Sequence, residues 1–120
     1  MDFRKSITQY IYDTYGTSAE YPWASSPENG IFRHRHNRKW YAALLRVSGN
    51  KVGLESEEPV DVINLKCEPD MVYTLSVQPG FAPAYHMNKK HWLTVRLDGS
   101  VPEEMIYRLI GISYELTGGR

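Results

Sequence analysis

The segment at residues 86–92 reads His-Met-Asn-Lys-Lys-His-Trp and crowds two histidines, an asparagine and two lysines into seven positions. Side chains of these types bind metals, contact phosphates, or exchange hydrogen bonds with bases and backbone groups. The segment runs directly into residues 92–97, whose aromatic and β-branched content predicts a buried strand. The polar cluster is therefore expected where a strand begins.

A second candidate site is basic. Residues 31–52 hold six basic side chains and no acidic one, whereas residues 55–70 hold six acids against a single lysine. The alternation from Ile31 predicts a strand with a basic face, and Asn37-Arg38 suits the turn of a hairpin. The hairpin tip would present Arg35, Arg38 and Lys39 together, which favours contacts with phosphates. The formal net charge of zero argues against a strongly basic, generic polyanion binder.

Metal and catalytic chemistry have less support. His34 and His36 lie two positions apart, and His86 and His91 five apart, but no spacing typical of a zinc site accompanies them. No nucleophile elbow, phosphate loop or dinucleotide glycine pattern occurs, and Cys67 lies at the end of an apolar strand pattern, where a buried thiol is usual. We therefore expect a binding protein rather than an enzyme, with no metal and no cofactor.

Structural roles compete with the functional ones for several residues. Asn88 and the neighbouring histidines are expected to bond backbone groups where the strand begins, as short polar side chains do at turns. Trp40 and Trp92 lie in apolar strand patterns and are expected to fill the core. Direct contact of these side chains with a ligand remains the alternative for both groups.

The patterning predicts an α+β domain spanning residues 1–120. It consists of a mainly antiparallel sheet of about five strands, with helices at the N-terminus, in the middle and at the C-terminus packed on one face. Helices are expected at 2–15, from Glu68-Pro69-Asp70 to Pro79-Gly80, and at 103–116, the last with Ser100 as its N-cap. Strands are expected at 31–36, 39–47, 51–54, 60–67 and 92–97.

The residues that carry this organisation resemble the MmcQ/YjbR family. The resemblance rests on the 86–92 segment, the later Leu97-Asp98-Gly99 and Val101-Pro102, and upstream strings at 21–23, 39–42, 64–69 and 79–85. Membership implies a fold similar to that of frataxin and CyaY, and DNA binding through a double-wing arrangement of β-hairpins. The motif maps onto His86, Asn88, Lys89, His91 and Trp92, with the hairpin tip at Arg38 and Lys39, and it brings no catalytic residues.

The leading prediction is a monomeric cytoplasmic DNA-binding domain with no membrane association. Its expected nucleic-acid contacts are Arg33, Arg35, Arg38, Lys39, Asn88, Lys89 and Lys90. The alternative is a protein-interaction or small-ligand-binding module that does not bind nucleic acid. Its site would be formed by Tyr85, His86, Asn88, His91 and Trp92.

Overall fold

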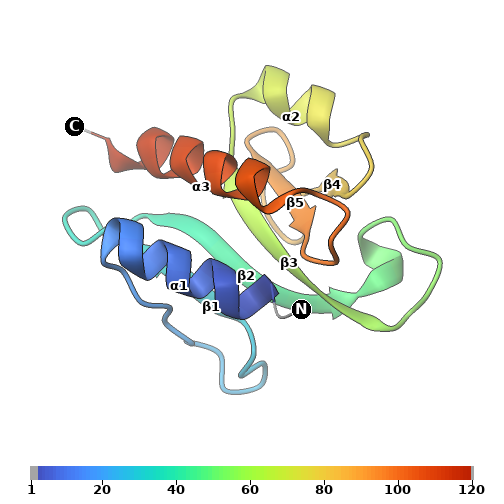
Figure 1. Ribbon diagram of the computed structural model, residues 1–120, viewed down its shortest axis with the longest axis horizontal. Helices are drawn as coiled ribbons and strands as arrows, with labels where there is room; N and C mark the ends of the chain where they lie inside the picture. The colour runs from blue at the N-terminus through green and yellow to red at the C-terminus, as the bar shows by residue number, and fades with distance from the viewer. Residues whose placement is uncertain (1–2, 120) are drawn as a thin grey trace.

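A computed structural model describes residues 3–119 of the chain (Figure 1). Residues 1, 2 and 120 of the predicted domain lie outside this range. The elements follow in the order α1 (Phe3–Tyr15), β1 (Gly30–Arg33), β2 (Trp40–Ser48), the 3-10 helix η1 (Gly49–Lys51), β3 (Pro59–Lys66), α2 (Pro69–Leu75), β4 (Phe81–Pro83), β5 (Trp92–Arg96) and α3 (Glu103–Gly118).

The five strands form one antiparallel sheet in the order β1-β2-β3-β5-β4. All three helices pack on the same face of this sheet, where α1 contributes Ile7 and Ile11, α2 contributes Val72, and α3 contributes Ile106 and other residues to one hydrophobic cluster. The predicted fold class is thereby confirmed. We call the opposite side of the sheet the loop face, because chain segments rather than helices lie over it.

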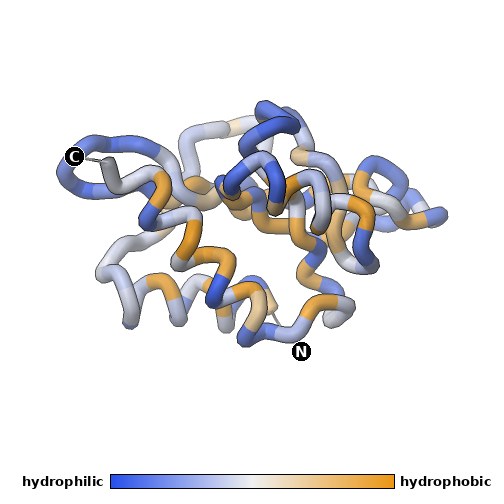
Figure 2. The backbone as a smooth tube through the Cα atoms, turned by 90° about the horizontal axis from the view of Figure 1, so that it is seen from above, coloured by the Kyte–Doolittle hydropathy of each residue, from blue (hydrophilic) through white to orange (hydrophobic). Residues whose placement is uncertain are grey.

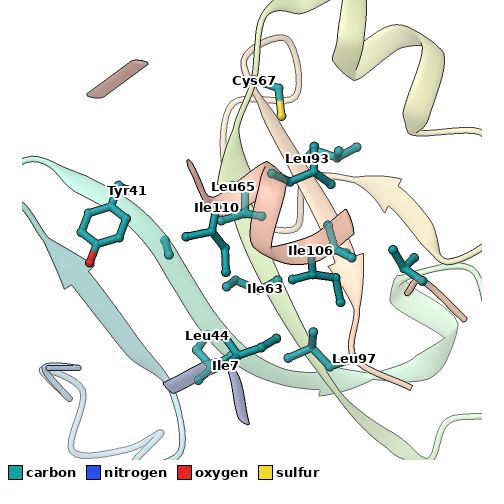
Figure 3. Packing of buried hydrophobic residues seen from close by; sticks show 14 of the residues in the cluster. Ile7, Tyr41, Leu44, Ile63, Leu65, Cys67, Leu93, Leu97, Ile106 and Ile110 are labelled. Carbon is teal, nitrogen blue, oxygen red and sulfur yellow. The ribbon is translucent and has the colours of Figure 1, made fainter. Parts of the chain in front are cut away.

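Alternation along the strands explains the two faces. Leu44, Ile63, Leu65 and Leu93 point toward the helices and are fully buried (Figure 3). Their neighbours in sequence point to the loop face, where a second cluster contains Ala43, Leu45, Val47, Val62 and Ala82 with Val52, Tyr85 and Met87 from the covering segments. Apolar residues accordingly concentrate in the sheet and on the inner side of α3, while the loop beside the C-terminus is hydrophilic (Figure 2).

Local patterning accounts for the helices. The spacing of three and four in α1 places Ile7 and Ile11 in the core, as predicted, with Phe3, Tyr10 and Tyr15 packed around them. Pro69 occupies the first turn of α2, where its missing N–H costs no hydrogen bond.

The predicted N-cap of α3 is wrong. Both the backbone N–H and the hydroxyl of Ser100 donate to the Asp98 carboxylate in a tight turn, so Pro102 precedes the first helical residue instead.

The strand predictions need three corrections. β1 ends at Arg33 rather than at residue 36, because His34 turns toward α3 and residues 35–37 form a turn. The expected strand at 51–54 is absent, since the N–H groups of Val52 and Leu54 both bond to the Gly49 carbonyl. β4 was not predicted, because three residues ending in proline carry almost no periodic signal.

Within residues 3–119, none of the helices combines the length and the apolar character that crossing a membrane requires.

Candidate nucleic-acid interface

Seven basic residues gather at one end of the sheet, where β1 and β3 end and β2 and β5 begin. We call this region the cationic end, and its members lie on or beside these strands or in the 34–39 and 84–91 loops: Arg33, Arg35, Arg38, Lys39, Lys66, Lys89 and Lys90. Arg33 pairs in register with Trp40, and Lys66 with Trp92. Because Leu65 and Leu93 face the helices, Lys66 and Trp92 face the loop side. The antiparallel pairing thus places a cation from each of β1 and β3 beside an aromatic ring from β2 and β5, respectively.

The 34–39 loop is fixed by the C-terminus of α3. The Asn37 amide donates to the carbonyls of Thr117 and Gly118 at 3.0 and 2.9 Å. A ring nitrogen of His36 lies 2.7 Å from the Gly118 carbonyl. These carbonyls belong to the last helical turn, which has no intrahelical donors, so the loop caps the helix. The hairpin tip is therefore a docked structural element, with α3 as its support (Figure 1).

His34 completes this docking from a buried position. Its Nε2 lies 2.8 Å from the Thr117 hydroxyl, which itself donates to the Ser113 carbonyl at 2.7 Å. Since the hydroxyl proton is committed to Ser113, the imidazole must donate from Nε2. Burial, and secondarily the nearby His36, lower the pKa of His34 below its usual value. A neutral His34 is the form that fits this site.

The predicted arginine contacts have partners within the chain. One Glu20 carboxylate binds Arg33 at 3.1 Å and Arg38 at 3.2 Å. Arg35 donates to the Gly16 carbonyl at 2.6 Å. Arg33 also lies over the Trp40 ring, 5.8 Å from its centroid.

Two of the four lysines of the cationic end are more available than the arginines. Lys39 and Lys90 are exposed, and neither ammonium group forms an ion pair with any of residues 3–119. The ammonium of Lys89 donates to the Ala84 carbonyl.

The 84–91 loop is anchored by a buried polar network. Asn64 on β3 is fully buried and accepts a hydrogen bond of 2.5 Å from the Thr94 hydroxyl on β5. The Asn64 amide donates to the Tyr85 carbonyl at 2.9 Å, and the Tyr85 N–H donates to the Thr94 hydroxyl at 3.0 Å. Both backbone groups of Tyr85 are thus bound to sheet side chains, which fixes the start of the loop.

Asn88 has the structural role that the sequence favoured. Its side-chain oxygen accepts from the N–H groups of Lys90 and His91, and its carbonyl accepts from the N–H of Trp92. These bonds close the turn that leads into β5. His91 contributes its carbonyl to the N–H of Cys67, joining the loop to the end of β3.

A pocket of about 300 Å³ opens on the loop face beside the cationic end. Its aromatic walls come from three separated segments: Trp23 before β1, Trp40 on β2, and Tyr85 with His86 after β4. The Trp23 and Trp40 rings are nearly perpendicular, with centroids 5.9 Å apart, and the rings of Tyr85 and His86 lie 4.0 Å apart. Ala43, Leu45 and Met87 supply apolar lining, and Ser25, Ser26 and Asn29 supply polar groups.

Only part of the predicted ligand cluster lines this pocket. Tyr85 and His86 do, whereas Asn88, His91 and Trp92 are not among its lining residues. Trp23 and the 25–29 segment were missed, although the Tyr-Pro-Trp string ahead of a Ser- and Pro-rich loop signals an exposed aromatic. Trp40 and Trp92 are half-buried on the loop face rather than in the helix-side core, so the expectation that they fill the core is only partly correct.

Acidic residues gather at the other end of the sheet. The connection between β2 and β3 carries Glu55, Glu57 and Glu58, all exposed, and antiparallel topology places it opposite the 34–39 loop (Figure 1). Asp61 lies nearby on β3, paired with Arg4 and Arg46 at 3.0 Å each. Burial alone would raise the pKa of Asp61, but the hydrogen bonds from Arg46 and Arg4 outweigh it and hold the pKa below its usual value.

The candidate groups for metal or nucleophilic chemistry are dispersed. Within the described range 3–119, no three His, Cys, Asp or Glu side chains are grouped so as to hold a metal ion. Cys67 is buried, as predicted, and burial raises the pKa of its thiol to about 11. The thiol is therefore protonated at neutral pH and is a poor nucleophile.

Comparison with known proteins shows which family this chain resembles. The sequence model described as YjbR matches residues 12–116. The uncharacterized protein YyaQ of Bacillus subtilis is 39% identical over 95% of this chain and 97% of its own length. The uncharacterized protein YjbR of Escherichia coli K12 is 37% identical over 67% of this chain and 69% of its own length. A crystal structure of a Pseudomonas syringae protein superposes with a TM-score of 0.92 at 42% identity, covering 95% of this chain and 97% of the other.

Proposed function

The chain belongs to the YjbR family, and from this premise we propose that it binds nucleic acid by contacting phosphates with the cationic end of its sheet. The observation that carries the proposal is the separation of charge along the sheet. Cations from β1, β3 and two loops lie at one end, and the acidic connection 49–58 lies at the other. A molecule without net charge thereby acquires a positive end that a polyanion can approach.

Within this end, the lysines are the main phosphate contacts. Arg33 and Arg38 share the Glu20 carboxylate, which offsets part of their charge, while Arg35 is held by a backbone carbonyl. Lys39 and Lys90 are exposed, and each sits on a loop anchored to the sheet or to α3. The arginines then shape and orient the hairpin, and the lysines meet the backbone of the nucleic acid.

The protein acts by binding rather than by catalysis. The protonated Cys67 is buried, and the side-chain oxygen of Asn88 in the 84–91 loop is committed to closing the turn before β5. Binding of a small ligand in the 300 Å³ pocket is the second candidate, because aromatic walls around a concave site are typical of ligand pockets.

The test is a titration of labelled DNA, duplex and single-stranded, followed by fluorescence anisotropy at low and at physiological salt. Wild-type protein should bind saturably, with an affinity that falls steeply as salt rises. Lys39→Glu and Lys90→Glu should each weaken binding several-fold and reduce the salt slope by about one, because each removes a phosphate contact.

Lys51→Glu is the matched control, since Lys51 is also an exposed lysine but lies on η1 at the acidic end. It should leave the affinity unchanged. An absence of binding at low salt would overturn the proposal, and so would a loss of affinity in Lys51→Glu as large as in the other two variants.

A further inference from the structure

We infer that the pocket beside the cationic end takes one unpaired nucleobase of the strand whose phosphates that end holds. The inference rests on the proposed function and assigns to it a base-binding site. The pocket and the cations share residues and neighbours, because Trp40 lines the pocket while Arg33 lies over its ring. Lys39 precedes Trp40, and Lys89 and Lys90 belong to the same loop as Tyr85 and His86. A strand bound at the cationic end therefore passes the mouth of the pocket.

The shape and lining of the pocket select a flat ring. Aromatic side chains provide faces on which any base can stack. A volume of about 300 Å³ is at the small end for ligand pockets, which suits one ring system rather than two stacked ones. Paired bases inside a duplex cannot enter such a pocket, so the occupant is a base from a single strand or one turned out of a helix.

The charge around the pocket argues against a quaternary ammonium cation as its ligand. Sites for quaternary ammonium groups use aromatic faces to attract a cation. Among residues 3–119, those that line this pocket include no Asp or Glu. The Arg33 guanidinium already lies over the Trp40 ring. A cationic ligand would be repelled, whereas an uncharged ring attached to a phosphate chain matches both the lining and its surroundings.

Polar groups at the rim can contact the edge of a base. The Asn29 side-chain oxygen accepts from the N–H of Arg46, which leaves its amide nitrogen as a donor. Ser25 and Ser26 add hydroxyl groups that both donate and accept.

The wall of the pocket formed by Tyr85 and His86 is preorganised. The buried Asn64 and Thr94 bind both backbone groups of Tyr85, and the backbone at His86 has φ +58°. A left-handed conformation at a non-glycine residue costs about 1–2 kcal/mol and persists where the surroundings enforce it. The sheet here enforces an arrangement in which His86 lines the pocket.

The experiment compares labelled oligothymidylate with an abasic oligomer that has the same number of phosphates, at one fixed low salt concentration. The variant is Trp23→Ala, because Trp23 is 37% exposed on a loop and its removal leaves the core clusters intact. Trp23→Phe serves as the conservative variant. Tyr73→Ala is the control, since Tyr73 is a large aromatic, 83% exposed on α2.

Wild-type protein should bind the oligothymidylate roughly tenfold or more tightly than the abasic oligomer, as expected for stacking of one base. Trp23→Ala should abolish this preference without changing the affinity for the abasic oligomer. Trp23→Phe should retain most of the preference, and Tyr73→Ala should retain all of it.

Four outcomes would overturn the inference, and they separate it from the proposed function. Equal binding of both oligomers by wild-type protein, or a preference that survives in Trp23→Ala, would remove the base site and leave phosphate binding in place. Failure of both oligomers to bind would overturn this inference, and the proposed function falls with it if duplex DNA also fails to bind at low salt. Displacement of the oligomer by free thymidine monophosphate at comparable concentration would assign the pocket to a mononucleotide instead of a strand.

Discussion

Asn64 shows how one residue connects the core of the sheet to the candidate site. It is fully buried on β3, and its amide binds the Thr94 hydroxyl and the Tyr85 carbonyl. Asn64→Leu should leave the Tyr85 carbonyl without a donor and the Thr94 hydroxyl proton without an acceptor, although that hydroxyl still accepts from the Tyr85 N–H. Since a buried polar group left unpaired costs about 1–3 kcal/mol, we expect the free energy of unfolding in urea to fall by roughly 2–5 kcal/mol.

A double-mutant cycle tests whether the two side chains act as one unit. The double variant Asn64→Leu/Thr94→Val also removes the Thr94 hydroxyl, which loses its acceptor in Asn64→Leu alone. The loss of unfolding free energy should therefore be smaller than the sum of the two single losses. Strictly additive losses would show that Asn64 and Thr94 stabilise the protein independently.

At the scale of elements, the contact between the 34–39 loop and α3 depends on a neutral histidine. Burial lowers the pKa of His34 in the folded protein below its unfolded value of about 6.5, so the unfolded state binds more protons below that pH. The stability contributed by neutral His34 is thus complete above pH 6.5 and is lost as the pH falls toward the folded pKa.

We expect the melting temperature to drop between pH 7 and pH 5 as a result. His34→Gln keeps an N–H donor for Thr117 but does not titrate, so it should flatten this dependence when thermal unfolding is followed by circular dichroism. An unchanged slope in His34→Gln would contradict the assignment.

The sequence predicted elements whose residues repeat with a clear period, and it failed where distant residues determine the conformation. The stripe from Phe3 to Tyr15 and the apolar run from Trp40 to Val47 were predicted correctly, because packing against one face requires such patterns. β1 was predicted too long, because the contact of His34 with Thr117 lies 83 residues away in sequence. Ser113 and Thr117 were missed for the same reason, since their burial reflects partners on other elements.

The candidate site was predictable only in its local parts. The turn at Asn88 and the basic hairpin follow from short strings of residues. The pocket joins segments around residues 23, 40 and 85, whose proximity depends on the pairing of β1 with β2 and on the anchoring of Tyr85. Neither long-range feature leaves a periodic signal.

At the scale of the whole molecule, Asp61 links α1 to the sheet near the acidic end. Its carboxylate binds Arg4 of α1 and Arg46 of β2, and its pKa is held below the usual value. A carboxyl group with a lowered folded pKa stabilises the protein above its unfolded pKa near 4 and loses that effect as the pH falls through the folded pKa.

Asp61→Asn should therefore lower the free energy of unfolding at pH 7 by roughly 1.5–3 kcal/mol, the usual range for hydrogen bonds to a charged group. The difference from wild type should shrink as the pH falls below 4. Glu57→Gln, an exposed acid in the same region, should change stability little at either pH. A constant difference across the whole pH range would show that the charge of Asp61 is unimportant.

The two outermost strands are short, which limits the pairing of the sheet with another copy of the protein. β1 has four residues and β4 has three, the last of which is Pro83, which has no backbone N–H. Beyond β1, a single bridge between Ile31 and Glu20 already occupies part of the outer rim. Edge strands this short expose too few unpaired backbone N–H and C=O groups for another chain to add a strand to the sheet. Edge-to-edge pairing of sheets from different copies is therefore disfavoured. We expect concentrated solutions of the folded protein to resist aggregation by this route.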